Sequence, residues 1–165
     1  MKNNVIGGHK AKSAGDSFEE LFIQICNRER IVCVDFPNGC RRVNTPYGLK
    51  LFATTMPFDF MICRAGLAAA IDVKTTQGKS FTYSSIVPHQ LKSLTEVGPH
   101  LPAGYVVWFR EVDRIVFFDY LALQSLQPRQ SLQPENGIFL GSIRDAKIER
   151  ILTHETATAY QRTLI

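Results

Sequence analysis

Hydrophobic residues near the N-terminus follow a helical repeat. They occupy positions i, i+3, i+4, i+7 and i+8, the spacing of one face of an amphipathic helix. The residues on this face are Phe18, Leu21, Phe22, Ile25 and Cys26. Ser13 and Asp16 have the spacing of a capping box directly before it. The pattern therefore predicts a first helix from about Asp16 to Arg28.

Five short runs rich in β-branched and aromatic residues predict strands. They span residues 31–36, 58–63, 68–75, 105–109 and 115–118. The second and third runs are separated by a turn short enough for an antiparallel hairpin, and the last two form another hairpin. Between the hairpins, Pro88 at a first-turn position and Gly98 at a C-cap bound a second helix.

These elements give the order α-β-β-β-α-β-β, which is typical of an α/β protein with a mixed central β-sheet flanked by helices. A length of 165 residues with 45% hydrophobic and 21% charged residues fits one globular domain. We expect a flexible basic arm over residues 1–15, or an idle tail there, a domain over 16–123, and a linker with a peripheral appendage over 124–165. Ser125–Pro128 recurs as Ser131–Pro134 in that linker, and a late helix is expected near Ser142, with Asp145 as its capping partner.

Composition narrows the setting of the protein. The apolar runs are too short to span a membrane, and the N-terminal residues lack a signal peptide's apolar core, so we expect a cytoplasmic protein. The net charge of +4 leans only mildly toward polyanions. The four cysteines lack a C-x2-C pair and are interpreted as reduced thiols, with a zinc site as a weak alternative.

The segment Ile71-Asp72-Val73-Lys74 places charge on one face of a predicted strand. Side chains alternate between the faces of a strand, so Asp72 and Lys74 point to one side. With Ala65-Gly66 at the tip of the hairpin, Asp59 falls opposite Asp72, to within one residue if a bulge forms. The register therefore brings two carboxylates together in an otherwise apolar sheet.

Two carboxylates so placed repel one another and are costly to desolvate. A hard divalent cation such as Mg²⁺, which prefers oxygen ligands, is the simplest compensation. The neighbouring Lys74 adds a compact positive charge suited to a water nucleophile or a phosphate oxygen. The alternative is a surface ion-pair cluster, which would contribute little.

Several motifs occur in order along residues 13–121. They are Gly15-x-x-Phe18-Glu19 on the first helix, an acid on one hairpin strand, Asp72-Val73-Lys74 on the next strand, Lys79-Ser80-Phe81, and His89-Gln90 at the start of a helix. This series resembles the PD-(D/E)XK nuclease superfamily and, within it, the RecU-type Holliday junction resolvases with their phage and prophage relatives. The resemblance implies a restriction-endonuclease-like core and a homodimer.

The resemblance also implies functions for individual residues. Asp59 and Asp72 would bind Mg²⁺, for which Mn²⁺ would substitute, with the Val73 carbonyl as a further ligand. Lys74 would orient the attacking water and stabilise the charge that develops on the phosphate. The triplet begins here with Asp72, whereas in many other family members it begins with Glu. Asp is one methylene shorter than Glu, and this shifts the geometry of the metal site.

Two further side chains are assigned to this site. Glu19 lies about 90° from the centre of the first helix's apolar face, so it can reach a site at the sheet edge, whereas Glu20 faces solvent. The resemblance implies that Glu19 supports the metal or its water and that Gln90 is a positioning group. Residues 37–57 are expected to be too short for the stalk that some cellular resolvases push into a junction.

Basic residues elsewhere are candidates for DNA contacts, since proteins contact phosphates mainly with Lys and Arg. The candidates are Arg41, Arg42, Lys79, Lys92 and His89. Scattered charges that serve solubility are the alternative, and His89 could merely assist the helix start. Trp108 and Phe109 lie in a continuously apolar run, which favours the core over a base-stacking surface.

The sequence thus predicts a Mg²⁺-dependent DNA endonuclease that cuts branched DNA, with four-way junctions as the favoured substrate. It would act in a bacterium or a phage-infected cell. One alternative keeps the nuclease but makes it an end-processing or restriction-like enzyme. The other is a DNA-binding scaffold whose acids no longer catalyse.

Overall fold

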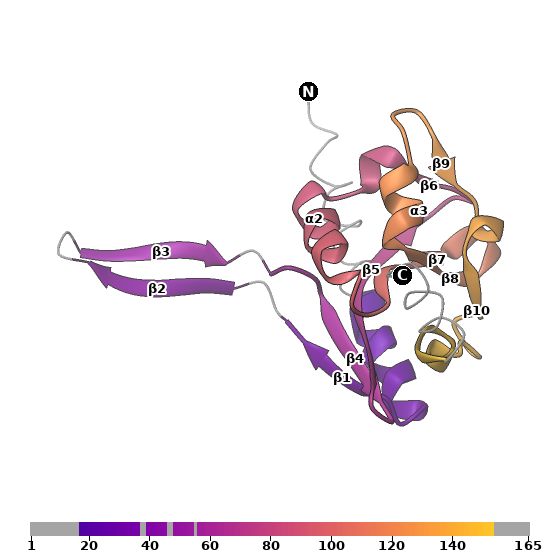
Figure 1. The fold of residues 1–165 in the computed structure, drawn as a ribbon, viewed down its shortest axis with the longest axis horizontal. Helices are drawn as coiled ribbons and strands as arrows, with labels where there is room; N and C mark the ends of the chain where they lie inside the picture. The colour runs from indigo at the N-terminus through magenta and orange to yellow at the C-terminus, as the bar shows by residue number, and fades with distance from the viewer. Residues whose placement is uncertain (1–16, 37–38, 46–47, 55, 154–165) are drawn as a thin grey trace.

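A six-stranded mixed sheet forms the centre of the computed structural model, which describes residues 17–36, 39–45, 48–54 and 56–153 (Figure 1). In spatial order the strands are β1 (Val32–Asp35), β4 (Phe60–Arg64), β5 (Leu67–Thr76), β7 (Ala103–Phe109), β8 (Arg114–Asp119) and β10 (Ile138–Gly141). Neighbours are antiparallel except for β5 and β7, which are parallel. This sheet, flanked by helices, confirms the predicted fold class.

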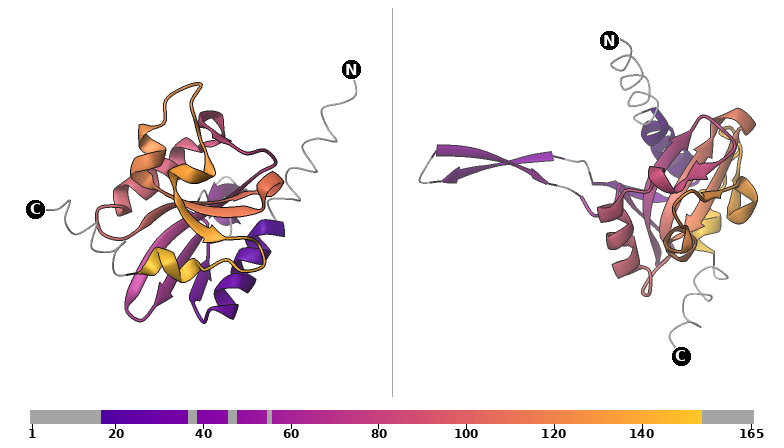
Figure 2. Two further views of the ribbon diagram at one scale, coloured as in Figure 1. Left: turned by 90° about the vertical axis from the view of Figure 1, so that its right-hand side faces the viewer. Right: turned by 90° about the horizontal axis from the view of Figure 1, so that it is seen from above.

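Helices cover both faces of the sheet (Figure 2). A helix over residues 17–28 packs on one face and buries Phe18, Phe22 and Ile25, as its apolar spacing predicts. The other face carries α2 (Pro88–Val97) and α3 (Tyr120–Ser125), and α2 forms the crossover between β5 and β7. Parallel strands need such a crossover, so the second predicted helix has a topological purpose.

The turn between β4 and β5 fixes the register of the hairpin. Ala65 and Gly66 both have positive φ, at 51° and 80°, as in the two-residue turns whose twist matches that of antiparallel strands. Phe60 pairs with Ile71 in the resulting ladder. This is the register predicted from the sequence, with no bulge at Gly66.

Alternation along β5 separates two buried clusters, one on each face of the sheet. Ile71 and Val73 belong to the cluster under the N-terminal helix, whereas Ala70 belongs to the cluster under α2. Phe109 is fully buried, and the partly buried Trp108 packs on Phe18 with ring centroids 5.5 Å apart. The expectation that both aromatic residues serve the core is confirmed.

Residues 138–152 contribute to the core, which corrects the expectation of a linker and a peripheral appendage after residue 123. β10 is the sixth strand of the sheet, and the short 3₁₀ helix η4 (Ile148–Leu152) buries Ile148 and Ile151 completely. Arg28 anchors this segment by donating hydrogen bonds of 2.8 Å to the backbone carbonyls of residues 144 and 146. Periodicity could not reveal this, because the contacts join residues more than a hundred positions apart.

Local structure after residue 123 also differs from expectation. Asp145 accepts hydrogen bonds from the backbone N–H and hydroxyl of Ser142, which closes a turn instead of starting a helix. The repeated segments bury Leu126 and Leu132 in the cluster under α2, so they are not an exposed linker. The remaining short elements are β6 (Phe81–Thr82), η1 (Tyr83–Ser85), η2 (Arg110–Val112), β9 (Ser131–Leu132), which pairs with β6, and η3 (Pro134–Asn136).

A hairpin projects from the body between β1 and β4 (Figure 1). Its strands β2 (Gly39–Thr45) and β3 (Gly48–Thr54) pair over seven residues, which is a reach of roughly 20 Å. The expectation that residues 37–57 are too short to form a stalk is therefore wrong. The polar residues of this segment do not prevent it from forming strands, because strand pairing depends on the partner strand as well as on composition.

The remaining expectations concern the N-terminal arm, the cysteines and the absence of a membrane-spanning helix. The basic arm over residues 1–15 lies outside the described residues, as does the side chain of Cys40. Cys26, Cys33 and Cys63 are free thiols, as predicted. In the part of the chain that the structure describes, no helix is long and apolar enough to cross a membrane.

Candidate metal centre

Two carboxylates and one ammonium group meet on the α2 face of the sheet. Asp59 directly precedes β4, and the hairpin register sets it beside Asp72 on β5. Lys74, two residues further along the same face, places its Nζ 3.6 Å from Asp59 Oδ2 and 3.5 Å from Asp72 Oδ1. Both oxygens therefore lie beside the same ammonium group, and the structure brings the two acids and Lys74 together as the hairpin register predicts.

Asp59 is held in position by two hydrogen bonds from neighbouring elements. The backbone N–H of Val73 donates to Asp59 Oδ2 at 3.0 Å. The Nε2 of Gln90, on the first turn of α2, donates to Asp59 Oδ1 at 3.4 Å. Gln90 thus contacts the site from a position two residues after Pro88, where α2 begins.

The two carboxylates differ sharply in their exposure to water. The Asp72 side chain is completely buried, whereas those of Asp59 and Lys74 are 15% and 20% exposed. Burial raises the pKa of Asp72 to about 8 because it disfavours the charged form; Lys74 opposes this shift, and the charge of Asp59 and a hydrogen bond to it add to it. The single positive charge of Lys74 therefore does not offset the cost of burying the Asp72 carboxylate.

Two buried oxygens at this site have no hydrogen-bond partner. They are Asp72 Oδ2 and Gln90 Oε1. A buried polar atom without a partner is costly, and such atoms are rare in native proteins. Carboxylate oxygens are the ligands that Mg²⁺ prefers, so a divalent cation fits Asp72 and Asp59 and would remove the deficit of positive charge.

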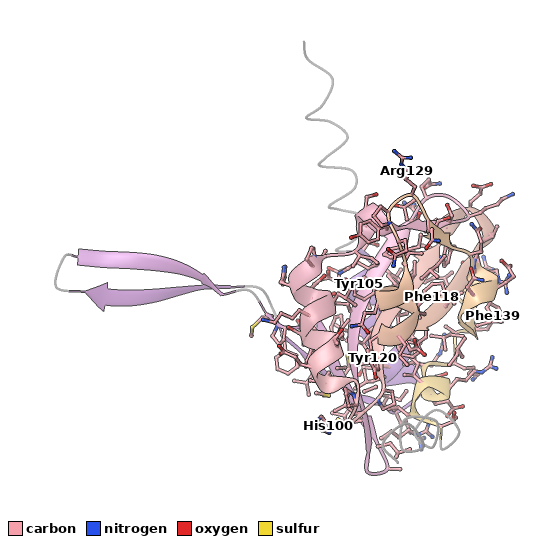
Figure 3. All side chains as sticks on the ribbon, turned by 45° about the horizontal axis from the view of Figure 1, so that its top comes forward. His100, Tyr105, Phe118, Tyr120, Arg129 and Phe139 are labelled. Atoms are coloured by element: carbon pink, nitrogen blue, oxygen red, sulfur yellow. The ribbon has the colours of Figure 1, made fainter. Side chains whose placement is uncertain are left out.

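Tyr105 is the residue at this site that sequence reasoning missed. Its ring lies beneath Lys74, with Nζ 5.1 Å from the ring centroid, and the residue, labelled in Figure 3, is fully buried. Its hydroxyl accepts a hydrogen bond of 3.3 Å from the backbone N–H of Val87. Burial, and the charges of Asp72 and Asp59, raise its pKa, so it remains a neutral phenol.

A signal for Tyr105 exists, but it requires the parallel pairing of β5 and β7. In that ladder Tyr105 is the partner of Asp72, and partners in adjacent strands share a face. The sequence shows only that residues 105–109 form an apolar strand. Which residues lie next to this strand depends on the parallel pairing of β5 and β7, and not on the local sequence pattern.

Glu19 does not complete a three-acid cluster. It is exposed on the N-terminal helix, which packs against the opposite face of the sheet from Asp72. Across the described ranges, no three His, Cys, Asp or Glu side chains gather as a group that could hold a metal ion. The contribution of Glu19 to catalysis stays a prediction, as does coordination by the Val73 carbonyl.

The candidate DNA-binding residues lie on three separate parts of the fold: α2, the segment after β5, and β2 of the projecting hairpin. Lys79 is exposed and lies 3.4 Å from Glu111, and Lys92 is exposed and lies 3.9 Å from Glu96 on the same helix. His89 is exposed on the first turn of α2. Arg41 and Arg42 lie on β2, where side chains are outside the described part of the structure. Their contacts with DNA stay predictions.

Comparison with known proteins supplies a structural neighbour. No protein-family model and no curated protein matches the chain. A solved structure of Hjc, a Holliday junction resolvase from the archaeal hyperthermophile Archaeoglobus fulgidus, superposes with a TM-score of 0.54 at 13% identity. The match covers 76% of this chain and 95% of Hjc. The chain shares the Hjc fold.

Proposed function

We propose that this chain is a Mg²⁺-dependent endonuclease of the RecU-like type that hydrolyses phosphodiester bonds in branched DNA. The observation that carries the proposal is the buried Asp72 carboxylate, which lies beside Asp59 and Lys74 and has one oxygen without a protein partner. An ion-pair cluster built only for stability would not need a second, fully buried acid.

Each side chain has a distinct task in this proposal. Asp59 and Asp72 hold the cation, with the Val73 carbonyl as a further ligand, and Gln90 keeps Asp59 oriented through its hydrogen bond. Lys74 faces the water side of the site, where its ammonium group orients the attacking water and offsets charge on the phosphate. A Mg²⁺ ion held by Asp59 and Asp72 would lower the pKa of that water and would polarise the phosphate.

Two observations support a branched substrate. The fold is shared with Hjc, whose described activity is the resolution of Holliday junctions. The β2–β3 hairpin projects from the body close to the strand that follows Asp59, so it would reach into DNA bound at the site (Figure 1). A symmetric four-way junction requires two cuts, and we propose a two-fold homodimer with one site in each protomer.

The basic side chains would complete the DNA contact. Lys79 and Lys92 are mostly exposed, and their acidic neighbours are exposed as well, so phosphates can replace these weak surface pairs. Arg41 and Arg42 would bring positive charge to the hairpin. His89 would meet a phosphate at the start of α2.

A cleavage assay tests the proposal. Purified protein with Mg²⁺ or Mn²⁺ is expected to cut a labelled four-way junction in preference to a linear duplex of the same sequence. Asp72→Asn and Lys74→Ala are expected to abolish cutting while binding, measured by gel shift, remains. Asp35→Asn removes an exposed acid at the end of β1 and is the matched control, expected to cut like the wild type.

The outcomes separate the alternatives. Wild-type protein that binds DNA but never cuts it would contradict the enzyme and support a DNA-binding scaffold. Equal cutting of junction and linear duplex would retain the nuclease and reject junction selectivity. Cutting by Asp72→Asn at the wild-type rate would reject the proposed site.

A further inference from the structure

We propose that Tyr105 is a positioning residue that holds the Lys74 ammonium group at the catalytic centre and ties α2 to the same point. The inference rests on the proposed function, since it assigns a partner to the lysine of that site. It concerns a residue on β7, one strand away from the Asp72-Val73-Lys74 motif on β5.

Lys74 needs a third neighbour to have a defined position. Its side chain has four rotatable bonds, and its two carboxylate contacts, at 3.5 and 3.6 Å, are longer than strong charge-assisted hydrogen bonds. The Tyr105 ring lies 5.1 Å from Nζ, within the range of a cation–π interaction. Two acids and one aromatic face therefore surround the ammonium group and leave a side open to water.

Tyr105 is itself held firmly enough to act as a platform. It is fully buried, its ring packs edge-on against Phe81 with centroids 5.9 Å apart, and its backbone lies in the β5–β7–β8 ladder. Its ladder partner on β8 is Phe118, which is buried beside it (Figure 3). The ring therefore has little freedom to follow a moving lysine, and the lysine has to conform to the ring.

The hydroxyl group connects the platform to α2. It accepts the hydrogen bond of the Val87 N–H, and Val87 is the residue that precedes the first turn of the helix. Gln90, on that turn, is the side chain that holds Asp59. Tyr105 thus fixes the ammonium group through its ring and the Asp59 contact through its hydroxyl, by two separable interactions.

Two substitutions separate these interactions. Tyr105→Phe keeps the aromatic face and removes the hydroxyl, so its cleavage rate is expected to stay within about threefold of wild type. Tyr105→Leu removes the aromatic face, and kcat is expected to fall by roughly tenfold, with KM for the junction unchanged. Phe109→Leu removes a fully buried aromatic ring from the same cluster, at a position whose ring packs on Phe118, and it serves as the control for lost packing.

The measurement is kcat and KM on the four-way junction for all four proteins, with thermal unfolding in parallel. The inference predicts that Tyr105→Leu and Phe109→Leu lose similar stability, and that only Tyr105→Leu loses kcat. Equal losses of kcat in these two variants, or a kcat for Tyr105→Phe as low as that of Tyr105→Leu, would overturn the inference while leaving the proposed nuclease intact. A wild-type protein that does not cut would overturn the proposed function and this inference together.

Discussion

The two faces of the central sheet differ in what they bury. The face under the N-terminal helix is closed by the helix and by η4, and its buried cluster is apolar. The Glu29 side chain, which is 5% exposed just after that helix, is paired with Lys147 and with the backbone N–H of Glu149. The face under α2 also has a large apolar cluster, but Asp72 and Gln90 are buried on that side. One strand, β5, contributes to both faces through consecutive residues.

One side of β5 contributes mainly to stability, and the other side carries the candidate site. Ile71 and Asp72 are both fully buried neighbours on one strand, yet one is surrounded by hydrocarbon and the other by charge. Burial of a charge costs stability unless it is compensated. Burial of Asp72 therefore lowers the stability of the fold on the α2 face, and hydrophobic burial on both faces offsets this loss. Substitutions on the two sides of β5 should have opposite effects on stability.

The largest effect is expected from Ile71→Asn on the apolar face. The change removes a buried aliphatic side chain and inserts an amide without partners, at a combined cost of about 4 kcal/mol or more. The free energy of unfolding, measured by urea denaturation, is expected to fall by that amount. A loss below about 1 kcal/mol would mean that water reaches this face, and it would contradict the proposed contrast between the two faces of the sheet.

Asp72→Asn, at the next residue, is expected to stabilise the metal-free protein by about 1–3 kcal/mol at pH 8. The Asp72 pKa rises from its ordinary value of 3.8 to about 8 in the folded state. Between these values the folded wild type binds more protons than the unfolded chain, so its stability falls as pH rises through this window. Asn cannot ionise, and its advantage should therefore grow from pH 4 to pH 8.

Urea denaturation at pH 5 and pH 8 with a chelator checks this prediction. The difference between Asp72→Asn and wild type is expected to be larger at pH 8 than at pH 5. A difference that does not change with pH would show that Asp72 is not the titrating group. A destabilised variant at both pH values would mean that the carboxylate is fully compensated without a metal.

A smaller effect is expected at the turn that sets the register of both faces. Gly66 has φ of +80°, so Gly66→Ala should cost about 1 kcal/mol through backbone strain alone, since nothing lies near the added methyl group. Gly78→Ala, which also meets no neighbour and lacks this backbone conformation, is the matched control and should be near neutral. Equal thermal unfolding of the two variants would contradict the turn geometry.

Most of the fold follows from local patterns in the sequence. Helical spacing from Phe18 onward, β-branched runs and the Ala65-Gly66 tip define the elements and the register that joins Asp59 to Asp72. The β2–β3 hairpin and the place of β10 do not follow in this way, because each depends on pairing with a distant or polar segment. Burial of Ile151 against the sheet likewise depends on contacts across the whole chain.

The candidate site also contains both residues that local patterns predict and residues whose positions depend on the topology. The pair of acids and Lys74 can be predicted because alternation and a two-residue turn are local properties. Tyr105 could not be predicted, since its position beside Asp72 comes from the parallel crossover through α2. The three-acid arrangement with Glu19 was inferred from a helical wheel, which gives a direction around the helix axis but not the face of the sheet on which the helix packs.

Titration calorimetry with Mn²⁺ at pH 8 tests the central claim that the buried pair on the α2 face is a metal site. Wild-type protein and the Asp35→Asn control are expected to bind Mn²⁺ with the same affinity. Asp72→Asn is expected to bind at least about tenfold more weakly, because it lacks the buried carboxylate whose oxygen has no protein partner. Equal affinity in wild type and Asp72→Asn would contradict the account.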